Sequence, residues 1–202
     1  KSATFKGIVR GSTAHIYQTT ASADMQKVTD RAISGGEFTY SLRPNSITIL
    51  ICGPEKEAEI SYSGEYTITS EYNSRVIHAD WNSSANGANV VMWDDSGLNC
   101  QKWMVTSVGG NYYQIVDKHT GKAMDVTGYS TENGANIQQW NYHGGSNQKW
   151  SFQDLGDGIV NIVSQFSGKC ADIEGWVHGN GGNVQQWTIN GSANKKWRLS
   201  QP

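Results

Sequence analysis

The sequence predicts an all-β protein in which three repeated units close into a barrel with pseudo-threefold symmetry. Two observations lead to this prediction. Tryptophans recur at a constant interval in the second half of the chain, and the segments between them show the short apolar–polar alternation of strands. Gly, Asn and Ser fill the gaps, while no long stretch has the period of a helix. Closing three such units into a barrel leaves no sheet edge exposed.

The composition of the 202-residue chain excludes several classes of protein. Charged residues make up only 17% and the formal net charge is −2, so the chain lacks the basic surface of a nucleic-acid-binding protein. Its longest apolar stretch, residues 47–52, is far shorter than the roughly 20 residues of a membrane span. The three cysteines are widely spaced and the five histidines occur singly, so we expect neither a metal site nor another cofactor.

A change in composition divides the chain into two parts. All eight tryptophans follow residue 80, and a polar segment with a Gly-Pro pair, residues 53–59, precedes them. We therefore predict an N-terminal segment over residues 1–52, a linker over 53–65 and a repeat domain over 66–202.

The N-terminal segment is predicted to form strands. Alternating or β-branched runs favour strands at residues 4–9, 14–19, 38–42 and 46–51. Residues 22–28 are also compatible with a helical turn. Because so few residues bury too little surface to be stable alone, we expect a partial β-sandwich, which the second part of the chain or a missing partner completes.

The repeat is most regular in its tryptophans. Two sets of three recur with intervals of 47 residues: Trp93, Trp140 and Trp187, and Trp103, Trp150 and Trp197. An aspartate precedes the first tryptophan of each unit, at Asp80, Asp125 and Asp172. These intervals predict three units, over residues 66–110, 111–157 and 158–202. We expect the second tryptophan set to share one core, because each member ends a unit beside apolar strand residues.

The words around these tryptophans resemble a known family. Each unit ends in a Gln-x-Trp word or a close variant, at residues 101–103, 148–150 and 195–197, downstream of its aspartate. Paired tryptophans and such words, in register three times, resemble the ricin-B-type β-trefoil lectins, which include the family 13 carbohydrate-binding modules. The resemblance implies a β-trefoil over residues 66–202 that binds carbohydrate.

The same resemblance implies which side chains contact a sugar. An aromatic side chain packs against the apolar face of a sugar ring, and carboxylates and amides bond to its hydroxyls. In the middle unit the family's positions fall on Asp125, Gln138, Trp140, His143 and Asn147. In the third unit they fall on Asp172, Gln185, Trp187, Asn190 and Asn194. The first unit offers Asp80 and Trp93, and we expect this site to be weak or dead because Val91 and Cys100 replace the amides.

A second resemblance concerns the N-terminal segment. Residues 36–48 follow the pattern Gly-x-Phe-x-x-x-Leu-x-Pro-x-Ser-Ile-Thr. This pattern is similar to the last strands of the β-sandwich attached to the catalytic barrels of family 30 glycoside hydrolases. The resemblance implies that the chain is the C-terminal end of a longer, secreted enzyme.

Three functions are compatible with these observations. The first is non-catalytic carbohydrate binding that targets a parent glycoside hydrolase to plant polysaccharide of xylan or galactan type, with ligands that contain xylose, arabinose or galactose. The second is an incomplete, xylanase-like glycoside hydrolase whose catalytic barrel is missing. The third, a trefoil used for protein contacts, is disfavoured because such proteins need no repeated Asp and Trp–Asn sites.

The carboxylates favour the first function. Five glutamates lie in or near the polar linker and are predicted to form a solvated charge cluster rather than the facing carboxylate pair of glycoside hydrolysis. They are Glu55, Glu57, Glu59, Glu65 and Glu71. We therefore expect no catalysis by this chain. The two resemblances imply an extracellular location, with polysaccharide and the parent enzyme as partners, and the composition implies that neither nucleic acid nor membrane is a partner.

Overall fold

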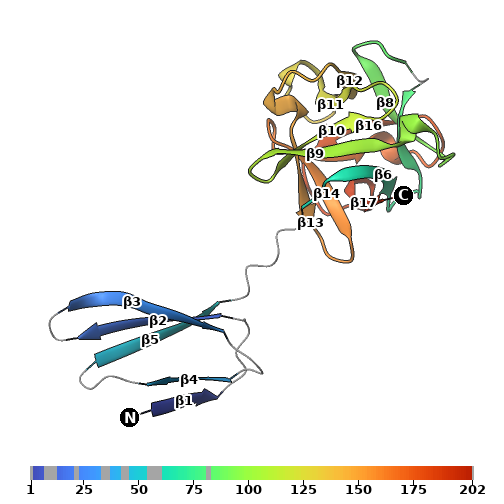
Figure 1. Cartoon of the computed structure of the whole chain (residues 1–202). Coiled ribbons are helices and arrows are strands. Elements are labelled where there is room, and N and C mark those ends of the chain that lie inside the picture. Colours follow the sequence, from blue (N-terminus) through green and yellow to red (C-terminus); the bar gives the residue numbers. More distant parts are fainter. Residues whose placement is uncertain are drawn as a thin grey trace. The chain divides into compact units, whose positions relative to one another are not determined.

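The computed structural model divides the chain into two units, Lys1–Ile60 and Ser61–Pro202 (Figure 1). It describes residues 61–80 and 83–201 in full. In the first unit it describes the backbone of five strands: β1 Ser2–Lys6, β2 Thr13–Thr20, β3 Ala23–Ala32, β4 Glu37–Ser41 and β5 Ser46–Gly53. The division between the units falls inside the predicted linker, residues 53–65.

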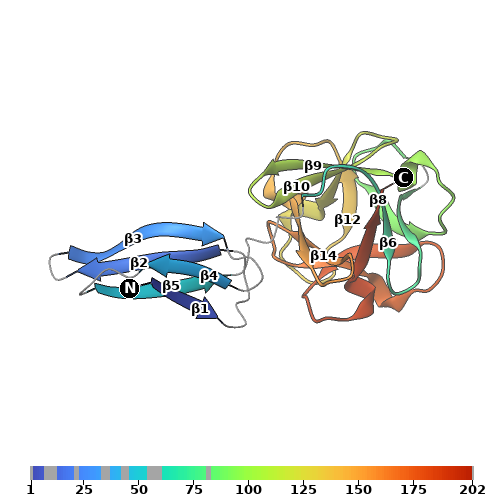
Figure 2. The same cartoon turned by 60° about the horizontal axis from the view of Figure 1, so that its bottom comes forward.

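The first unit contains two small antiparallel sheets among its described strands. In one sheet β2 lies between β3 and β5, and in the other β1 pairs with β4 (Figure 2). The suggested helical turn at residues 22–28 is wrong, because residues 23–28 belong to β3. Pairing with β2 along most of β3 outweighs a weak local preference for helix. Residues 7–9 of the first predicted strand lie outside the described residues.

The second unit is a β-trefoil, so the predicted all-β fold is confirmed. Its twelve strands are β6 Gly64–Ser70, β7 Val76–Ala79, β8 Ala88–Trp93, β9 Trp103–Gly109, β10 Tyr112–Asp117, β11 Ala123–Val126, β12 Ile137–Trp140, β13 Trp150–Asp154, β14 Ile159–Ser164, β15 Cys170–Ile173, β16 Gly182–Trp187 and β17 Trp197–Ser200. In the part of the unit that the structure describes, three-residue 3-10 turns accompany them: η2 Asn99–Gln101, η3 Thr127–Tyr129, η4 Ser146–Gln148, η5 Glu174–Trp176 and η6 Ala193–Lys195. Because β6 begins at Gly64, the last two residues of the predicted linker belong to the trefoil.

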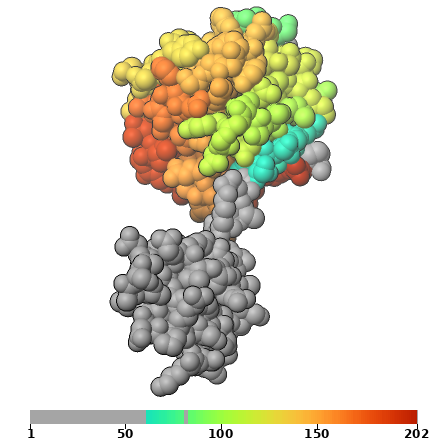
Figure 3. All heavy atoms as spheres, turned by 60° about the vertical axis from the view of Figure 1, so that its left-hand side comes forward, coloured from blue at the N-terminus to red at the C-terminus, as the bar shows by residue number. Residues whose placement is uncertain are grey.

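Six of the strands close a barrel. Around it, β6 pairs with β9, β9 with β10, β10 with β13, β13 with β14, β14 with β17, and β17 with β6. Figure 3 shows β6 in cyan beside the green segment of β9, although more than thirty residues separate them in the chain. The other six strands form three hairpins, which meet where β8 pairs with both β12 and β16. Closure pairs the barrel edges and gives the three repeats one shared axis.

The repeated tryptophans at the barrel strands share one core, as predicted. Trp103, Trp150 and Trp197 are each 0% exposed and belong to the same apolar cluster. Each indole Nε1–H donates to a backbone carbonyl at 3.1 Å, and the three acceptors are Ile77, Met124 and Ala171. These acceptors are also 47 residues apart, so each tryptophan ties the barrel to the hairpin of its own repeat.

The repeated Gly-x-Asn words attach each hairpin to the next repeat. Gly87 donates its N–H to the carbonyl of Gln139 at 2.8 Å, and Gly134 donates to Gln186 at 2.9 Å. Both glycines have φ values, 87° and 84°, that other residues rarely adopt. A Cβ at Gly134 would contact the ring of Trp187 at 3.8 Å. The loop of the middle repeat therefore packs beside the exposed tryptophan of the third repeat.

Candidate functional site

Strand pairing brings the predicted site residues together in the middle and third repeats. In the third repeat, β15 places Asp172 directly opposite Gln185 on β16, and Trp187 follows two residues later on the same strand. In the middle repeat, Asp125 on β11 faces Gln138 on β12 in the same register. The asparagines arrive from the 3-10 turns η4 and η6, and both are buried.

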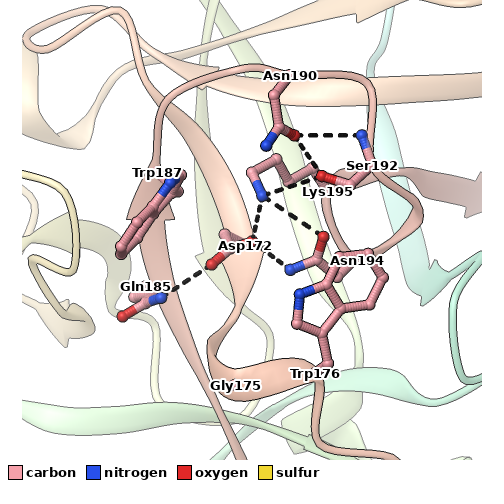
Figure 4. A pocket seen from close by; sticks show the side chains of 9 residues that line it. All are labelled: Asp172, Gly175, Trp176, Gln185, Trp187, Asn190, Ser192, Asn194 and Lys195. Atoms are coloured by element: carbon pink, nitrogen blue, oxygen red, sulfur yellow. Dashed lines mark hydrogen bonds and ion pairs between the residues drawn. The ribbon is translucent and has the colours of Figure 1, made fainter.

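The third site is a polar pocket of about 220 Å³ with a buried carboxylate at its base (Figure 4). Asp172 accepts hydrogen bonds from Gln185 Nε2 at 2.9 Å and from Asn194 Nδ2 at 2.5 Å. Lys195 Nζ lies 2.8 Å from Asp172 Oδ1. Trp187, which is 38% exposed, stands at one side of the pocket. The arrangement offers an apolar ring beside a fixed hydrogen-bond acceptor.

The remaining predicted residue of the third repeat, Asn190, lies at the rim of the same pocket. Its side-chain oxygen accepts hydrogen bonds from the backbone N–H and the hydroxyl of Ser192. Its Nδ2 group has no hydrogen-bond partner recorded among the described residues, so it is a donor that a ligand hydroxyl can use.

The middle site repeats the same hydrogen bonds. Asp125 accepts from Gln138 Nε2 at 3.0 Å and from Asn147 Nδ2 at 2.8 Å. Trp140 is 38% exposed, as its counterpart in the third repeat is. His143 Nε2 lies 3.8 Å from Asp125 Oδ2, which is too long for a direct hydrogen bond. Among the described residues, the buried oxygen Asn147 Oδ1 has no hydrogen-bond partner.

Asp125 and Asp172 differ in their charged neighbours. Burial raises the pKa of Asp125, and the hydrogen bonds from Gln138 and Gln148 and the charge of His143 offset this only in part. In the third repeat the position of Gln148 is occupied by Lys195, whose ammonium group pairs directly with Asp172.

The glutamine that Lys195 replaces has a structural role in the other repeats. Gln148 donates to the carbonyl of Asn141 at 3.0 Å and accepts from the N–H of His143 at 2.8 Å. Gln101 makes the equivalent bonds to Asp94 and Ser96 in the first repeat. In both repeats this glutamine braces the loop after the exposed tryptophan.

The pairing register corrects one expectation in the first repeat. On β7, His78 and not Asp80 is the residue opposite Val91, the position that Asp125 and Asp172 occupy in the other repeats. Asp80 lies beyond the end of β7. Position 78 lies 47 residues before position 125, which is the repeat interval, so the sequence already indicated that His78 is the equivalent of Asp125. The search for a repeated aspartate led to Asp80 instead.

The first site therefore has a different chemistry from the other two. His78 Nδ1 lies 3.8 Å from the Sγ of Cys100, and its ring stacks on Trp93 with centroids 5.6 Å apart. Burial lowers the pKa of His78, which favours the neutral imidazole. The first site has His78, Val91 and Cys100 where the other sites have Asp, Gln and Asn. That it binds sugar weakly or not at all stays a prediction.

Two aromatic residues beside the pockets escaped the sequence analysis. Trp176 lines the third pocket, and Tyr129 holds the equivalent position in the middle repeat. Each stands four residues after the site aspartate in an Asp-x-x-Gly-aromatic word, a repeated signal that was available in the sequence.

The described residues contain no grouping of three or more His, Cys, Asp or Glu side chains that could hold a metal ion. In the same part of the chain, no helix has the length and apolar character needed to cross a membrane.

Comparison with known proteins identifies the family. The model of the ricin-type beta-trefoil lectin domain-like family matches residues 58–140 and 146–202. The chain belongs to this family. A comparison with curated protein sequences gives no match.

Solved structures share the fold of this unit. The designed threefold-symmetric protein ThreeFoil is 38% identical, with a TM-score of 0.68 over 69% of this chain and 99% of its own. The exo-beta-1,3-galactanase 1,3Gal43A from Clostridium thermocellum is 28% identical, with a TM-score of 0.66 over 95% of this chain and 44% of its own. This chain thus spans less than half of the galactanase. The Polyporus squamosus lectin, 24% identical with a TM-score of 0.60 over 70% of this chain and 50% of its own, shares the fold.

Proposed function

We propose that residues 61–202 form a non-catalytic carbohydrate-binding module that holds a parent, secreted glycoside hydrolase on plant polysaccharide of xylan or galactan type. One observation carries this proposal. The middle and third repeats build the same constellation twice, with a buried aspartate held by a glutamine and an asparagine beside a half-exposed tryptophan.

This constellation matches the two faces of a sugar. The C–H face of a pyranose packs on an aromatic ring. Trp140 and Trp187 provide such rings at the surface. Its hydroxyls need acceptors and donors in fixed places, which the buried carboxylates Asp125 and Asp172 and their amide neighbours supply. Two such sites on one module increase the affinity for a polymer through avidity.

Similarity to the galactanase supports the part of the proposal that concerns a parent enzyme and a galactan ligand. That protein is an exo-beta-1,3-galactanase, and a part of it resembles 95% of this chain. The same similarity favours the second candidate, an incomplete glycoside hydrolase whose catalytic part lies elsewhere. A reducing-sugar assay on this chain, alone and mixed with the rest of the parent enzyme, tests the second candidate, because release of sugar by the chain alone would contradict a pure binding module.

Calorimetric titration tests the binding proposal. Asp125→Ala and Asp172→Ala are each expected to remove one site for soluble xylo- or galacto-oligosaccharide, and the double variant to remove both. The middle site is expected to be the stronger, with affinities in the millimolar to micromolar range, about 4–8 kcal/mol. Asp80→Ala is the matched control, because Asp80 lies outside both constellations. Unchanged binding in the folded double variant contradicts the proposal.

Binding to insoluble polysaccharide adds an independent test. Loss of either site is expected to reduce retention on xylan or galactan by more than half, since avidity is lost together with the site. If retention persists in the double variant, the polysaccharide contacts another surface. If the wild-type chain is not retained on any plant polysaccharide, the alternative of a trefoil used for protein contacts is favoured.

A further inference from the structure

The third pocket has aromatic side chains on two sides of its carboxylate. Trp187 and Trp176 both line it, and Asp172 lies between them (Figure 4). Trp176 is 48% exposed, more than Trp187. Large apolar side chains that stay exposed at the rim of a polar pocket commonly mark a binding surface. A single sugar that stacks on Trp187 already reaches the polar groups of the site. The ring of Trp176 therefore remains available for a further sugar unit.

The position of Trp176 is imposed by its surroundings. Its φ is 56°, a left-handed conformation that bulky residues rarely adopt, and Gly175 before it has a φ of 59°. Tyr72, which belongs to the first repeat, donates its hydroxyl to the backbone carbonyl of Trp176 at 2.8 Å. The two rings meet edge to face with centroids 5.0 Å apart. Contacts from another repeat thus hold this exposed aromatic residue in place, as the edge-to-face contact with Phe166, at 5.2 Å between centroids, does for Tyr129 in the middle repeat.

We propose that Trp176 forms a second sugar subsite, so that the third pocket binds two linked sugar units. One unit packs on Trp187 with its hydroxyls on Asp172, and the adjacent unit packs on Trp176. This inference rests on the proposed carbohydrate-binding function and names its ligand as an oligosaccharide of at least two units.

The middle pocket differs at the same place. Tyr129 Oη lies only 2.1 Å from the position that a Cβ on Gly145 would take, so this side chain reaches across to the loop after Trp140. Its ring is 6.1 Å from that of His143. In the third repeat Ser192 occupies the position of Gly145, with its hydroxyl bonded to Asn190. In the middle repeat the side chain of Tyr129 thus lies against Gly145 and near His143, and we expect this site to take a single unit.

Titrations of the full chain in an Asp125→Ala background isolate the third site. The probes are galactose with β-1,3-galactobiose and, in parallel, xylose with xylobiose, followed by NMR of the indole N–H signals of Trp176 and Trp187. We expect the preferred disaccharide to bind more tightly than its monosaccharide and to shift both signals. Trp176→Gly suits the left-handed backbone and is expected to lower disaccharide affinity about three- to tenfold while leaving monosaccharide affinity unchanged.

A second variant guards against a purely structural effect. Trp176→Tyr places in the third repeat the residue that the middle repeat carries with a φ of 51°, so the backbone tolerates it. It is expected to retain most of the disaccharide affinity. Equal losses for mono- and disaccharide in Trp176→Gly, or unchanged disaccharide affinity, overturn the second subsite. If sugars shift Trp187 but not Trp176, only this inference fails. If no sugar shifts Trp187, the proposed function fails with it.

Discussion

Replacing Asp172 by Asn is expected to destabilise the trefoil strongly, because it leaves the ammonium group of Lys195 buried without a counter-charge. The two side chains are each 4% exposed, and Nζ lies 2.8 Å from Oδ1. The other groups near Nζ are neutral and more distant, at 3.3 Å for Ser192 Oγ and 3.4 Å for Asn194 Oδ1. Removal of one partner of a buried ion pair costs about 3–5 kcal/mol. We expect Asp172→Asn to lose at least about 3 kcal/mol of unfolding free energy.

The middle repeat shows how the loss can be reversed. It has Gln148 where the third repeat has Lys195, and its aspartate accepts hydrogen bonds from amide side chains and has no lysine beside it. Lys195→Gln is therefore expected to cost only about 1 kcal/mol, the scale of one hydrogen bond. The double variant Asp172→Asn/Lys195→Gln has no buried charge and is expected to recover most of the stability that Asp172→Asn loses.

Urea unfolding followed by tryptophan fluorescence measures this prediction. All eight tryptophans lie in the second unit, so the signal reports on the trefoil without the first unit. The midpoints and slopes of the four proteins give the coupling energy of a double-mutant cycle. Asp125→Asn is the matched control, since it removes the equivalent carboxylate where no lysine is paired with it. A coupling below about 1 kcal/mol, or a loss for Asp125→Asn as large as that for Asp172→Asn, would refute the reasoning.

Three further outcomes are expected. Burial raises the pKa of Asp125, so its contribution to stability is present below the unfolded value of 3.8 and is lost as the pH rises through the folded pKa. The melting temperature of Asp125→Asn relative to that of the wild type should therefore be higher at pH 7 than at pH 4. The same difference in melting temperature at both pH values would contradict this. Burial also raises the pKa of Cys170 to about 12, so iodoacetamide at pH 8 should modify this thiol only after denaturation, as mass spectrometry of the peptide would show. Gly145→Ala should displace Tyr129, whose hydroxyl occupies the space of the new Cβ, and should also disturb His143 Cε1 and the buried Asn147 Oδ1, which lie 2.6 and 2.7 Å from that Cβ. It is expected to change sugar affinity at the middle site and to destabilise the trefoil by about 1–3 kcal/mol. Unchanged calorimetric binding would contradict that steric argument.

The repeat and the core could be predicted from the sequence because both depend on a constant interval. Units of constant length that each end in a tryptophan can bury these rings together by packing around a shared axis. Trp103, Trp150 and Trp197 meet this condition, and the structure buries all three together. The candidate site was predictable for a related reason. Asp125 and Gln138 are neighbours across one short hairpin, so their contact depends on local pairing alone.

Other features depended on the register of strand pairing, which the spacing of residues along the sequence did not fix. The backbone pairing of β7 with β8 and the bond from Trp103 to Ile77 place His78 at the first site, whereas counting back from Trp93 to an aspartate suggested Asp80. Residues 23–28 form a strand because β2 pairs with them.

The sequence by itself determined the threefold trefoil and the two Asp–Gln–Trp–Asn constellations, since both follow from repeated spacing and pairing within hairpins. Only the tertiary structure decided how the two sites differ. Trp176 is held by Tyr72 from 104 positions away in the chain, and the ammonium of Lys195 meets Asp172 only after β15 and η6 have packed together. The contact between Tyr72 and Trp176 arises because the closed barrel brings its first and last repeats side by side, whereas the pair of Lys195 and Asp172 forms within the third repeat.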